Sequence, residues 1–382
     1  MGYGPGDVLQ LIRSGRATTR SEILVETGMS RVTVTQRIEA LRTAGLIRAA
    51  GDGAATGGRR ATTFVFDPDT VIAVAALDLE SGRVALADAH GEILASREIV
   101  APLGEGPPDT LAAVTGQMAS LMDASGITQD RLEAVGLSVP GPIDPVSQRL
   151  VEPPIMPAWN GWPIVESIRE RFDTPVYLEN DADAMAYGEW GLESDAATRP
   201  FFLVKVSEFI GGGIVLDGRI FRGYDGGAGD IGHVFVGGDQ LCRCGRRGCL
   251  ATEASGDAVV TRLQSQGVPV ESVPDIARLV ATGDARVTGE VHRAGELIGQ
   301  VLGTVVGVLN PASLVVSGAL ASTALVASIR TAVYASTLPR ATRHLDIRQG
   351  RLGDSSALTG LARVAVADVF SAAQVDQRLS RS

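Results

Sequence analysis

All three cysteines of this 382-residue chain lie within eight residues, Cys242 to Cys249, in the stretch GHVFVGGDQLCRCGRRGC. His233, one of only four histidines, lies in the same stretch. Such a cluster in a short loop indicates a metal site, a disulfide or a thiol centre. The N-terminus, MGYGPGDVLQLIRSGRATT, lacks the basic start, apolar run and small-residue cleavage site of a signal peptide. We therefore expect the protein to be located in the cytoplasm. That reducing compartment favours metal ligation over a disulfide.

Charge is unevenly distributed along the chain. The formal net charge is −10, yet residues 1–60 carry nine Arg against five Asp and Glu, which gives +4 and leaves −14 for the rest. Lys205 is the only lysine. A small basic module joined to an acidic body is typical of a DNA-binding protein with a separate sensing domain. No apolar run reaches the roughly 18 residues that a membrane span needs, so no membrane partner is expected.

The segment TTRSEILVETGMSRVTVTQRIEALRTAGLI, residues 18–47, predicts two helices joined by a tight turn. Thr19 and Glu22 form a capping box for the first helix, and Ser30 caps the second. Apolar side chains recur at helical spacing along the second helix, at Val34, Ile38 and Leu41. Residues 8–12 supply a third helix that closes a small core.

The outward face of the second helix carries polar side chains that suit base edges and phosphates in a major groove. They are Ser30, Arg31, Thr33, Gln36 and Arg37. The following residues, 46–66, predict two short strands around a Gly-rich turn with Arg59 and Arg60, a basic wing that reaches phosphates. The alternative is a packing module whose arginines only keep it soluble, because helix-turn-helix shapes occur without DNA. The wing and the local positive charge favour a winged helix-turn-helix over residues 1–70 that binds double-stranded operator DNA.

From about Val71 onward, strands alternate with helices, which is typical of α/β architecture. Residues 71–100 predict three short strands and residues 109–126 an amphipathic helix, and a second strand set begins at RPFFLVKV. We therefore expect two lobes with a cleft between them, residues 71–195 and 196–382, with a C-terminal helix able to return to the first lobe.

Four segments resemble the ROK family of repressors, open reading frames and kinases. They are GLSVPGPIDP…EPPIMPAWNGWP, LENDADAMAYGE, GGGIVLDGRIFRG and GAGDIGHVFVGGDQLCRCGRRGCL. The resemblance covers roughly residues 71–382, and the helix-turn-helix before them matches the repressor branch. It implies an actin- and hexokinase-like (ribonuclease H-like) fold with two lobes around a sugar cleft. Family kinases phosphorylate hexoses with ATP, and family repressors respond to sugars or sugar phosphates.

The cysteine stretch then supplies one imidazole and three thiolates, a closed tetrahedral set for structural Zn²⁺ that leaves no position for a metal-bound water. The four ligands are His233, Cys242, Cys244 and Cys249. Gly245 and Gly248 allow the loop to curl tightly. The resemblance places this zinc beside the sugar pocket, and unmetallated thiols remain the alternative.

The resemblance also assigns the sugar contacts, to Asn160, Asn180, Asp181, Asp230 and His233. Asp181 occupies the position of the family's catalytic base, although capping of the following helix is an alternative role for it and for Asn180. Asp230 is one methylene shorter than the family's Glu. Ala251 replaces a Glu that holds a sugar hydroxyl, a loss of about 1.5–3 kcal/mol, with Glu253 two residues on.

The ATP-binding loops depart further from the family. The family's Asp-x-Gly-Gly-Thr loop is Asp78-Leu79-Glu80-Ser81-Gly82 here, and its Gly-Thr-Gly loop is Ser207-Glu208-Phe209. Both changes set a carboxylate against the phosphates, and a third turn keeps only Gly318 of a glycine pair. We therefore predict that ATP is not bound, that Asp181 is a vestigial base, and that the protein is not an enzyme.

The sequence thus predicts a sugar-responsive regulator, a repressor of carbohydrate-related genes. A sugar or sugar phosphate in the cleft would close the lobes and shift two DNA heads away from operator spacing. We expect a homodimer or a dimer of dimers, because one small winged helix contacts too few base pairs for a genomic search. Two alternatives stay open: a sugar kinase that uses Asp181, and a zinc-containing interaction protein without a ligand.

Overall fold

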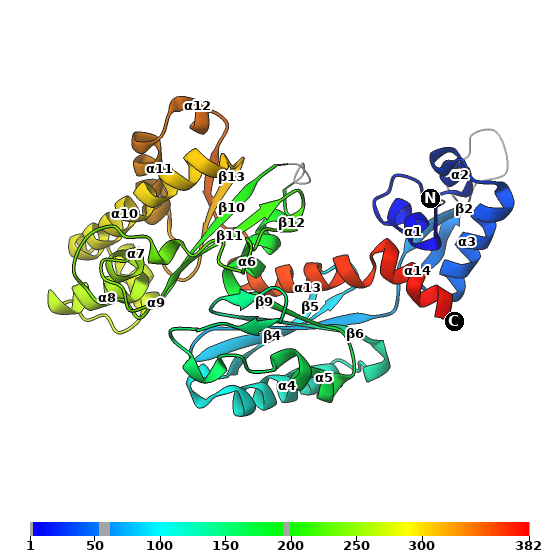
Figure 1. Cartoon of the computed structure of the whole chain (residues 1–382), viewed down its shortest axis with the longest axis horizontal. Helices are drawn as coiled ribbons and strands as arrows, with labels where there is room; N and C mark the ends of the chain where they lie inside the picture. Colours follow the sequence, from blue (N-terminus) through cyan, green and yellow to red (C-terminus); the bar gives the residue numbers. More distant parts are fainter. Residues whose placement is uncertain (1–2, 53–61, 194–198, 382) are drawn as a thin grey trace.

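The computed structural model of the chain describes residues 3–52, 62–193 and 199–381. It begins with three helices and one antiparallel strand pair (Figure 1). These elements are α1 (Pro5–Arg13), α2 (Arg20–Thr27), α3 (Arg31–Thr43), β1 (Ile47–Asp52) and β2 (Thr62–Phe66). The predicted capping box of Thr19 and Glu22 starts α2, and Gly28 ends it at φ 66°. The predicted helix-turn-helix and the strand pair after it are therefore present, whereas the predicted turn of the wing lies outside the described residues. We call residues 3–52 and 62–66 the head.

The body contains two five-stranded sheets with the same topology. In each, the first three strands form an antiparallel meander, and the fourth and fifth add in parallel beside the first strand. The first sheet has the order β5 (Ile93–Val100), β4 (Ser81–Asp88), β3 (Val71–Leu77), β6 (Leu132–Val139), β9 (Val176–Asn180). The second has the order β12 (Arg219–Ile220), β11 (Ile210–Leu216), β10 (Phe201–Val206), β13 (Ser313–Ser317), β14 (Asp346–Gln349). This repeat is the two-lobed α/β architecture that the sequence predicts.

Helices cover the outer faces of both sheets. The first sheet packs on α4 (Pro107–Ala124) and α5 (Ile164–Phe172). The second packs on α7 (Leu250–Ala254), α8 (Gly256–Ser265), α9 (Val273–Ala281), α10 (Ala285–Leu309) and α11 (Thr323–Ser336), with α12 (Pro339–Thr342) beside them. The remaining short elements are β7 (Ile143–Asp144), β8 (Arg149–Leu150) and the 3-10 helices Leu103–Glu105, Gln129–Arg131, Pro157–Trp159, Ile231–His233 and Gly353–Ser355.

Two helices lie between the sheets, α6 (Asp181–Trp190) and α13 (Ser356–Val369) (Figure 1). They cross at glycines, because a Cβ on Gly360 would lie 1.8 Å from the carbonyl oxygen of Ala184, and one on Gly188 2.1 Å from that of Ser356. Since α6 packs on β10 and β11 and α13 packs on β3 and β6, this crossing joins the two lobes.

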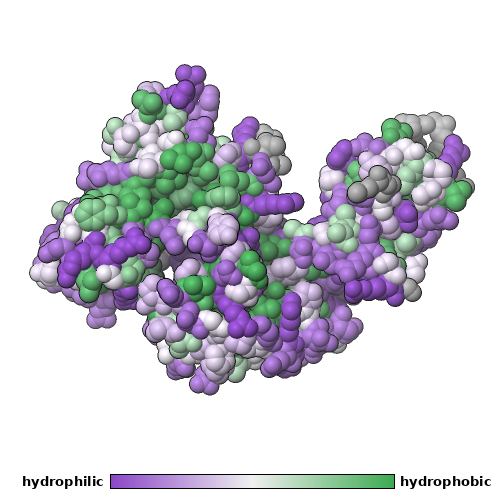
Figure 2. Space-filling model, in the orientation of Figure 1, coloured by the Kyte–Doolittle hydropathy of each residue, from purple (hydrophilic) through white to green (hydrophobic). Residues whose placement is uncertain are grey.

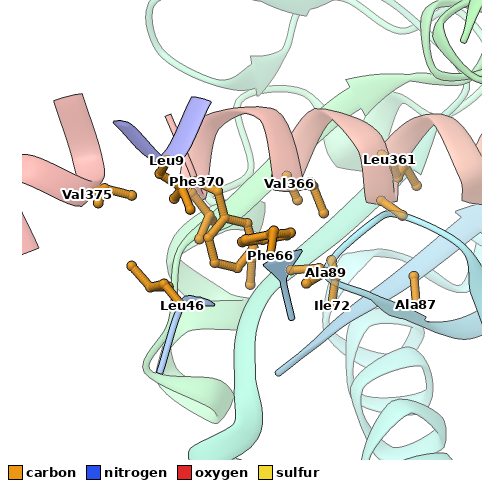
Figure 3. Close-up of a cluster of buried hydrophobic side chains, with 14 of the residues drawn as sticks. Leu9, Leu46, Phe66, Ile72, Ala87, Ala89, Leu361, Val366, Phe370 and Val375 are labelled. Atoms are coloured by element: carbon orange, nitrogen blue, oxygen red, sulfur yellow. The ribbon is translucent and has the colours of Figure 1, made fainter. Parts of the chain in front are cut away.

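The C-terminal end of the chain ties the head to the first lobe. Helix α14 (Ala372–Arg381) packs on α1, and α13 covers the first sheet, so the C-terminal segment does return to the first lobe. Figure 3 shows one apolar cluster that includes side chains of the head, the first sheet and both helices. At its centre the rings of Phe66 and Phe370 meet edge to face, 5.0 Å apart. Head and first lobe therefore share a single core.

Among the described residues, no single helix has both the length and the hydrophobicity to cross a membrane. One pair of helices bent by 52°, Gly353–Val369 with Ala372–Arg381, meets those two criteria only when taken together.

Candidate functional site

The predicted DNA-contacting residues lie at the start of α3 and on its outer face. Ser30 caps α3, with its Oγ accepting from the Thr33 backbone N–H at 3.1 Å. Val34, Ile38 and Leu41 are buried beneath the helix, as predicted. Arg31 and Gln36 are exposed on the other side. Thr33 and Arg37 are half-buried, and Arg59 and Arg60 lie outside the described residues.

Two arginines of α3, Arg31 and Arg37, differ from the other arginines of the head that lie near carboxylates. Four other arginines form ion pairs with carboxylates: Arg16 with Glu26, Arg20 and Arg42 with Glu39, and Arg48 with Asp67. Within the described ranges, Arg31 and Arg37 form none. Their charges are therefore available for an external anion such as a phosphate.

The four predicted metal ligands converge on one point. The Nδ1 of His233 lies 3.6 Å from the Sγ of Cys242, and the Sγ atoms of Cys244 and Cys249 lie 3.7 Å apart. All four ligand atoms lie within 4.8 Å of one another, so they could hold a metal ion. Cys242 and Cys249 are buried and the other two are half-buried.

The loop reaches this arrangement through positive φ at two glycines. Gly245 has φ 83° and Gly248 φ 68°, as the sequence predicts. A Cβ on Gly248 would meet the carbonyl oxygen of Gly237 and the ring of Phe235 at 2.7 Å, whereas at Gly245 the space is open. Two isolated bridges, Phe235 to Cys249 and Leu241 to Arg247, close the loop.

Asn180 and Asp181 lie where β9 ends and α6 begins. The Oδ1 of Asn180 accepts from the N–H groups of Ala182 and Asp183, and its Nδ2 donates to the carbonyl oxygen of Gly141 at 2.9 Å. The Oδ1 of Asp181 also accepts from Ala182, at 2.7 Å. Both side chains therefore cap α6, the alternative role considered above, and the second oxygen of Asp181 faces the cleft described below.

The other predicted sugar contacts come from loops. Asp230 and His233 lie together around the 3-10 helix Ile231–His233, with the His233 N–H donating to the Asp230 carbonyl oxygen. Asn160 is exposed, and its Oδ1 accepts from the N–H of Glu152 at 2.9 Å. Glu253 forms an ion pair with Arg293 of α10 at 3.0 Å, so it does not stand free in place of the Glu replaced by Ala251.

Sequence reasoning missed a buried charge cluster next to Asp181. Arg222, from the loop after β12, pairs with both carboxylate oxygens of Glu179 at the end of β9. Asp183 is 5% exposed, and its Oδ1 has no partner among the described residues. Burial, together with the nearby Glu179 charge, raises the pKa of Asp183 well above its ordinary value. The alternating acidic residues of LENDAD could have indicated such a cluster, but Arg222, the partner of Glu179, lies 43 residues further along the chain.

A cleft of about 740 Å³ lies between the lobes on the other side of Asp181. Lys205 extends into it from β10, with its Nζ 2.6 Å from Asp181 Oδ2 and 2.9 Å from Asp78 Oδ1. Burial alone would lower the pKa of Lys205, but the two carboxylates outweigh it and raise the pKa above its ordinary value. From the sequence, Lys205 is notable only as the single lysine, and its position in this cleft was not predicted.

Two backbone donors at the cleft are engaged within the protein. The Ala319 N–H donates to Ser207 Oγ at 3.0 Å, and the N–H of Ser207 itself donates to the Phe209 carbonyl oxygen at 2.9 Å. Glu80 and Glu208 line the same cleft. These two N–H groups are therefore engaged within the protein, and Glu80 and Glu208 add two negative charges where a phosphate would lie.

Comparison with known proteins gives one consistent family. The model of the ROK family matches residues 79–367. The chain is 28% identical to the DNA-binding transcriptional dual regulator NagC of Escherichia coli K12, over 94% of this chain and 91% of that protein. It is 25% identical to the xylose repressor of Bacillus spizizenii, over 94% of each protein.

Solved structures agree on the fold. A crystal structure of a ROK family transcriptional regulator, a homolog of the E. coli MLC protein, matches with a TM-score of 0.83 at 22% identity, covering 99% of this chain and 98% of that one. The ROK hexokinase of Thermus thermophilus matches with a TM-score of 0.64 at 28% identity, covering 78% of this chain and 99% of that one. Because the family model extends from the turn after β3 to the last turn of α13, this protein belongs to the ROK family.

Proposed function

We propose that the protein is a sugar-responsive transcriptional regulator that represses carbohydrate-related genes. The observation that carries this proposal is the head: α3 presents Arg31 and Arg37, neither of which has an ion-pair partner in the described part of the chain, and the head shares a core with the first lobe. NagC and the xylose repressor, similar over nearly the whole chain, support it. We assign DNA binding to residues 1–70 and effector binding to the lobes at residues 71–195 and 196–382.

In this proposal α3 enters a major groove, where Arg31, Thr33, Gln36 and Arg37 contact base edges and phosphates. Arg59 and Arg60 would contact the DNA backbone.

A second copy of the chain would bind the second half-site of the operator, because a single small head gives too little specificity. Figure 2 shows apolar surface over α10, and the exposed side chains there and on neighbouring elements include Val308, Tyr334 and Leu338. This surface is our candidate contact between the two copies.

The effector would be a sugar or sugar phosphate held by Asn160, Asn180, Asp181, Asp230 and His233.

Zn²⁺ is our candidate for the metal. In a tetrahedral site, Zn–S bonds of about 2.3 Å and Zn–N bonds of about 2.0–2.1 Å place two sulfurs about 3.8 Å apart, and a sulfur and a nitrogen about 3.6 Å apart. The observed separations are 3.7 and 3.6 Å. Bound Zn²⁺ would balance the thiolate charges and fix the loop. His233, ligating through Nδ1, would keep Nε2 for the sugar.

We further propose that the protein does not phosphorylate sugars. A base must accept a proton from the sugar hydroxyl, and Asp181 Oδ2 is instead bonded to the Lys205 ammonium at 2.6 Å, while Asp181 Oδ1 accepts from the Ala182 N–H. Glu80 and Glu208 repel the phosphates of ATP. Incubation with ATP and a panel of hexoses should therefore give no sugar phosphate, and sustained turnover would favour the kinase alternative.

The regulator proposal is tested by fluorescence anisotropy on DNA from around the protein's own gene, with excess nonspecific DNA and then added sugars and sugar phosphates. We expect specific binding that one of these compounds weakens. Arg31→Ala should weaken binding and reduce the slope of log K against log salt by about 1, because one phosphate contact is lost. Arg42→Ala, which removes an arginine already paired with Glu39, is the matched control. Absence of specific binding anywhere in the genome would refute the proposal.

A further inference from the structure

The chain's only lysine connects the two lobes. Lys205 belongs to β10 of the second sheet, whereas Asp78 directly follows β3 of the first sheet. Asp181 begins α6, the helix through which the lobes cross. The ammonium of Lys205 contacts both carboxylates, so this one side chain spans the cleft between the lobes.

The two contacts differ in exposure. The side chains of Lys205 and Asp181 are 12% and 14% exposed, so their contact is largely shielded from solvent. Asp78 is 61% exposed, so its contact is weaker and the first to break. The other cation that lines the cleft, Arg83, pairs with Glu98 of β5 and, at 3.7 Å, with the exposed Asp354 just before α13, the helix that packs on the first sheet. Glu80 and Glu208 line the cleft as well and leave an excess of negative charge that favours a cation at its centre.

We propose that Lys205, Asp78 and Asp181 form a latch that holds the lobes together in the ligand-free protein. The ammonium from the second lobe neutralises two carboxylates of the first lobe, which would otherwise repel each other. A ligand hydroxyl that donates to Asp181 Oδ2 competes with this ammonium, so ligand binding weakens the latch. In this proposal an effector loosens a contact already formed between the lobes, whereas the sequence alone led us to expect that a sugar closes them. This last step rests on the proposed function, whereas the latch itself does not.

Because Lys205 is the only lysine, amine acylation reports on the latch directly. Its rate is measured by mass spectrometry in the folded protein and in the same protein unfolded in urea. We expect Lys205 to react much more slowly in the folded protein, because its ammonium is paired with two carboxylates and its side chain is only 12% exposed. Asp78→Asn should raise the Lys205 rate by about two- to fivefold, corresponding to about 0.4–1 kcal/mol for a half-exposed pair. Arg83→Met, which removes the other cation in the cleft, should leave it unchanged.

The effect on the lobes is measured by hydrogen exchange of the segments at the two walls, residues 76–84 and 204–209. Lys205→Met keeps the length of the side chain and removes its charge, and we expect it to speed exchange at both walls. Asp78→Asn should do so more weakly, and adding it to Lys205→Met should cause no further change, because both break the same contact. The latch is refuted if Lys205 reacts as fast in the folded protein as in the unfolded protein, or if Lys205→Met and Arg83→Met change exchange alike. Faster exchange in Lys205→Met with unaltered operator affinity would overturn the regulatory step.

Discussion

The shared core between head and first lobe makes a quantitative prediction for Phe370→Ala. Phe370 is fully buried, its ring meets that of Phe66 at 5.0 Å, and the Arg13 guanidinium lies over both rings. Truncating a buried Phe to Ala costs about 3–5 kcal/mol, of which the aromatic pair accounts for about 0.5–1.5 kcal/mol. Since 1.4 kcal/mol corresponds to a factor of ten, docking of the head should weaken by about 100-fold or more.

Hydrogen exchange of α1 measures this loss locally, which avoids assuming that a multidomain chain unfolds in one step. The slow amides of α1 should exchange about 100-fold faster in Phe370→Ala. Tyr224→Ala removes an aromatic side chain that is 99% exposed and should change exchange by less than about threefold. If α1 responds as weakly in Phe370→Ala as in Tyr224→Ala, the head does not depend on this core and the reasoning fails.

Two further predictions concern the metal loop and the buried charge cluster. Gly248→Ala should weaken Zn²⁺ binding strongly, measured in competition with a chromophoric chelator, because a Cβ there would lie 2.7 Å from neighbouring atoms. Gly245→Ala meets open space, so it should cost only about 1 kcal/mol of backbone strain. Equal losses of Zn²⁺ affinity in the two variants would contradict this prediction. The pKa of Asp183 is raised by burial and by the Glu179 charge. Above a pH of about 4, the folded state therefore binds more protons than the unfolded chain, so the protein loses stability as the pH rises. Asp183→Asn abolishes this loss, so its stability relative to the unmodified protein in urea should increase from pH 5 to pH 7, and a pH-independent difference would count against a raised pKa.

Features set by local sequence were predicted well. The capping box at Thr19, the cap of α3 at Ser30 and the buried stripe of α3 depend on residues only a few positions apart. The positive φ values of Gly245 and Gly248 follow from the same short-range logic. In the body, the alternation of strands and helices predicted two lobes. The repeated strand order emerged only from the pairing of strands far apart in the chain.

Contacts between distant segments could not be derived from the sequence in this way. Lys205 meets Asp78 across 127 positions of the chain, and nothing around Lys205 indicates a carboxylate partner. The pair of Arg222 and Glu179 is hidden for the same reason. Asn180 and Asp181 were predicted as sugar contacts, but only the structure shows how much of their hydrogen-bonding capacity α6 and Lys205 already use. The polar chemistry of this cleft is thus set by tertiary contacts.

The arrangement of the connections explains how a change in the cleft would reach DNA. The head is packed on α13, α14 and the first sheet, so it moves with the first lobe. The apolar surface over α10 belongs to the second lobe (Figure 2). In a dimer formed through α10, the second lobes would be fixed to each other, and any rotation about the α6–α13 crossing would move the two heads relative to one another. Half-sites at a fixed separation tolerate little such movement. A head-to-head distance that stays constant when an effector weakens operator binding would exclude this route.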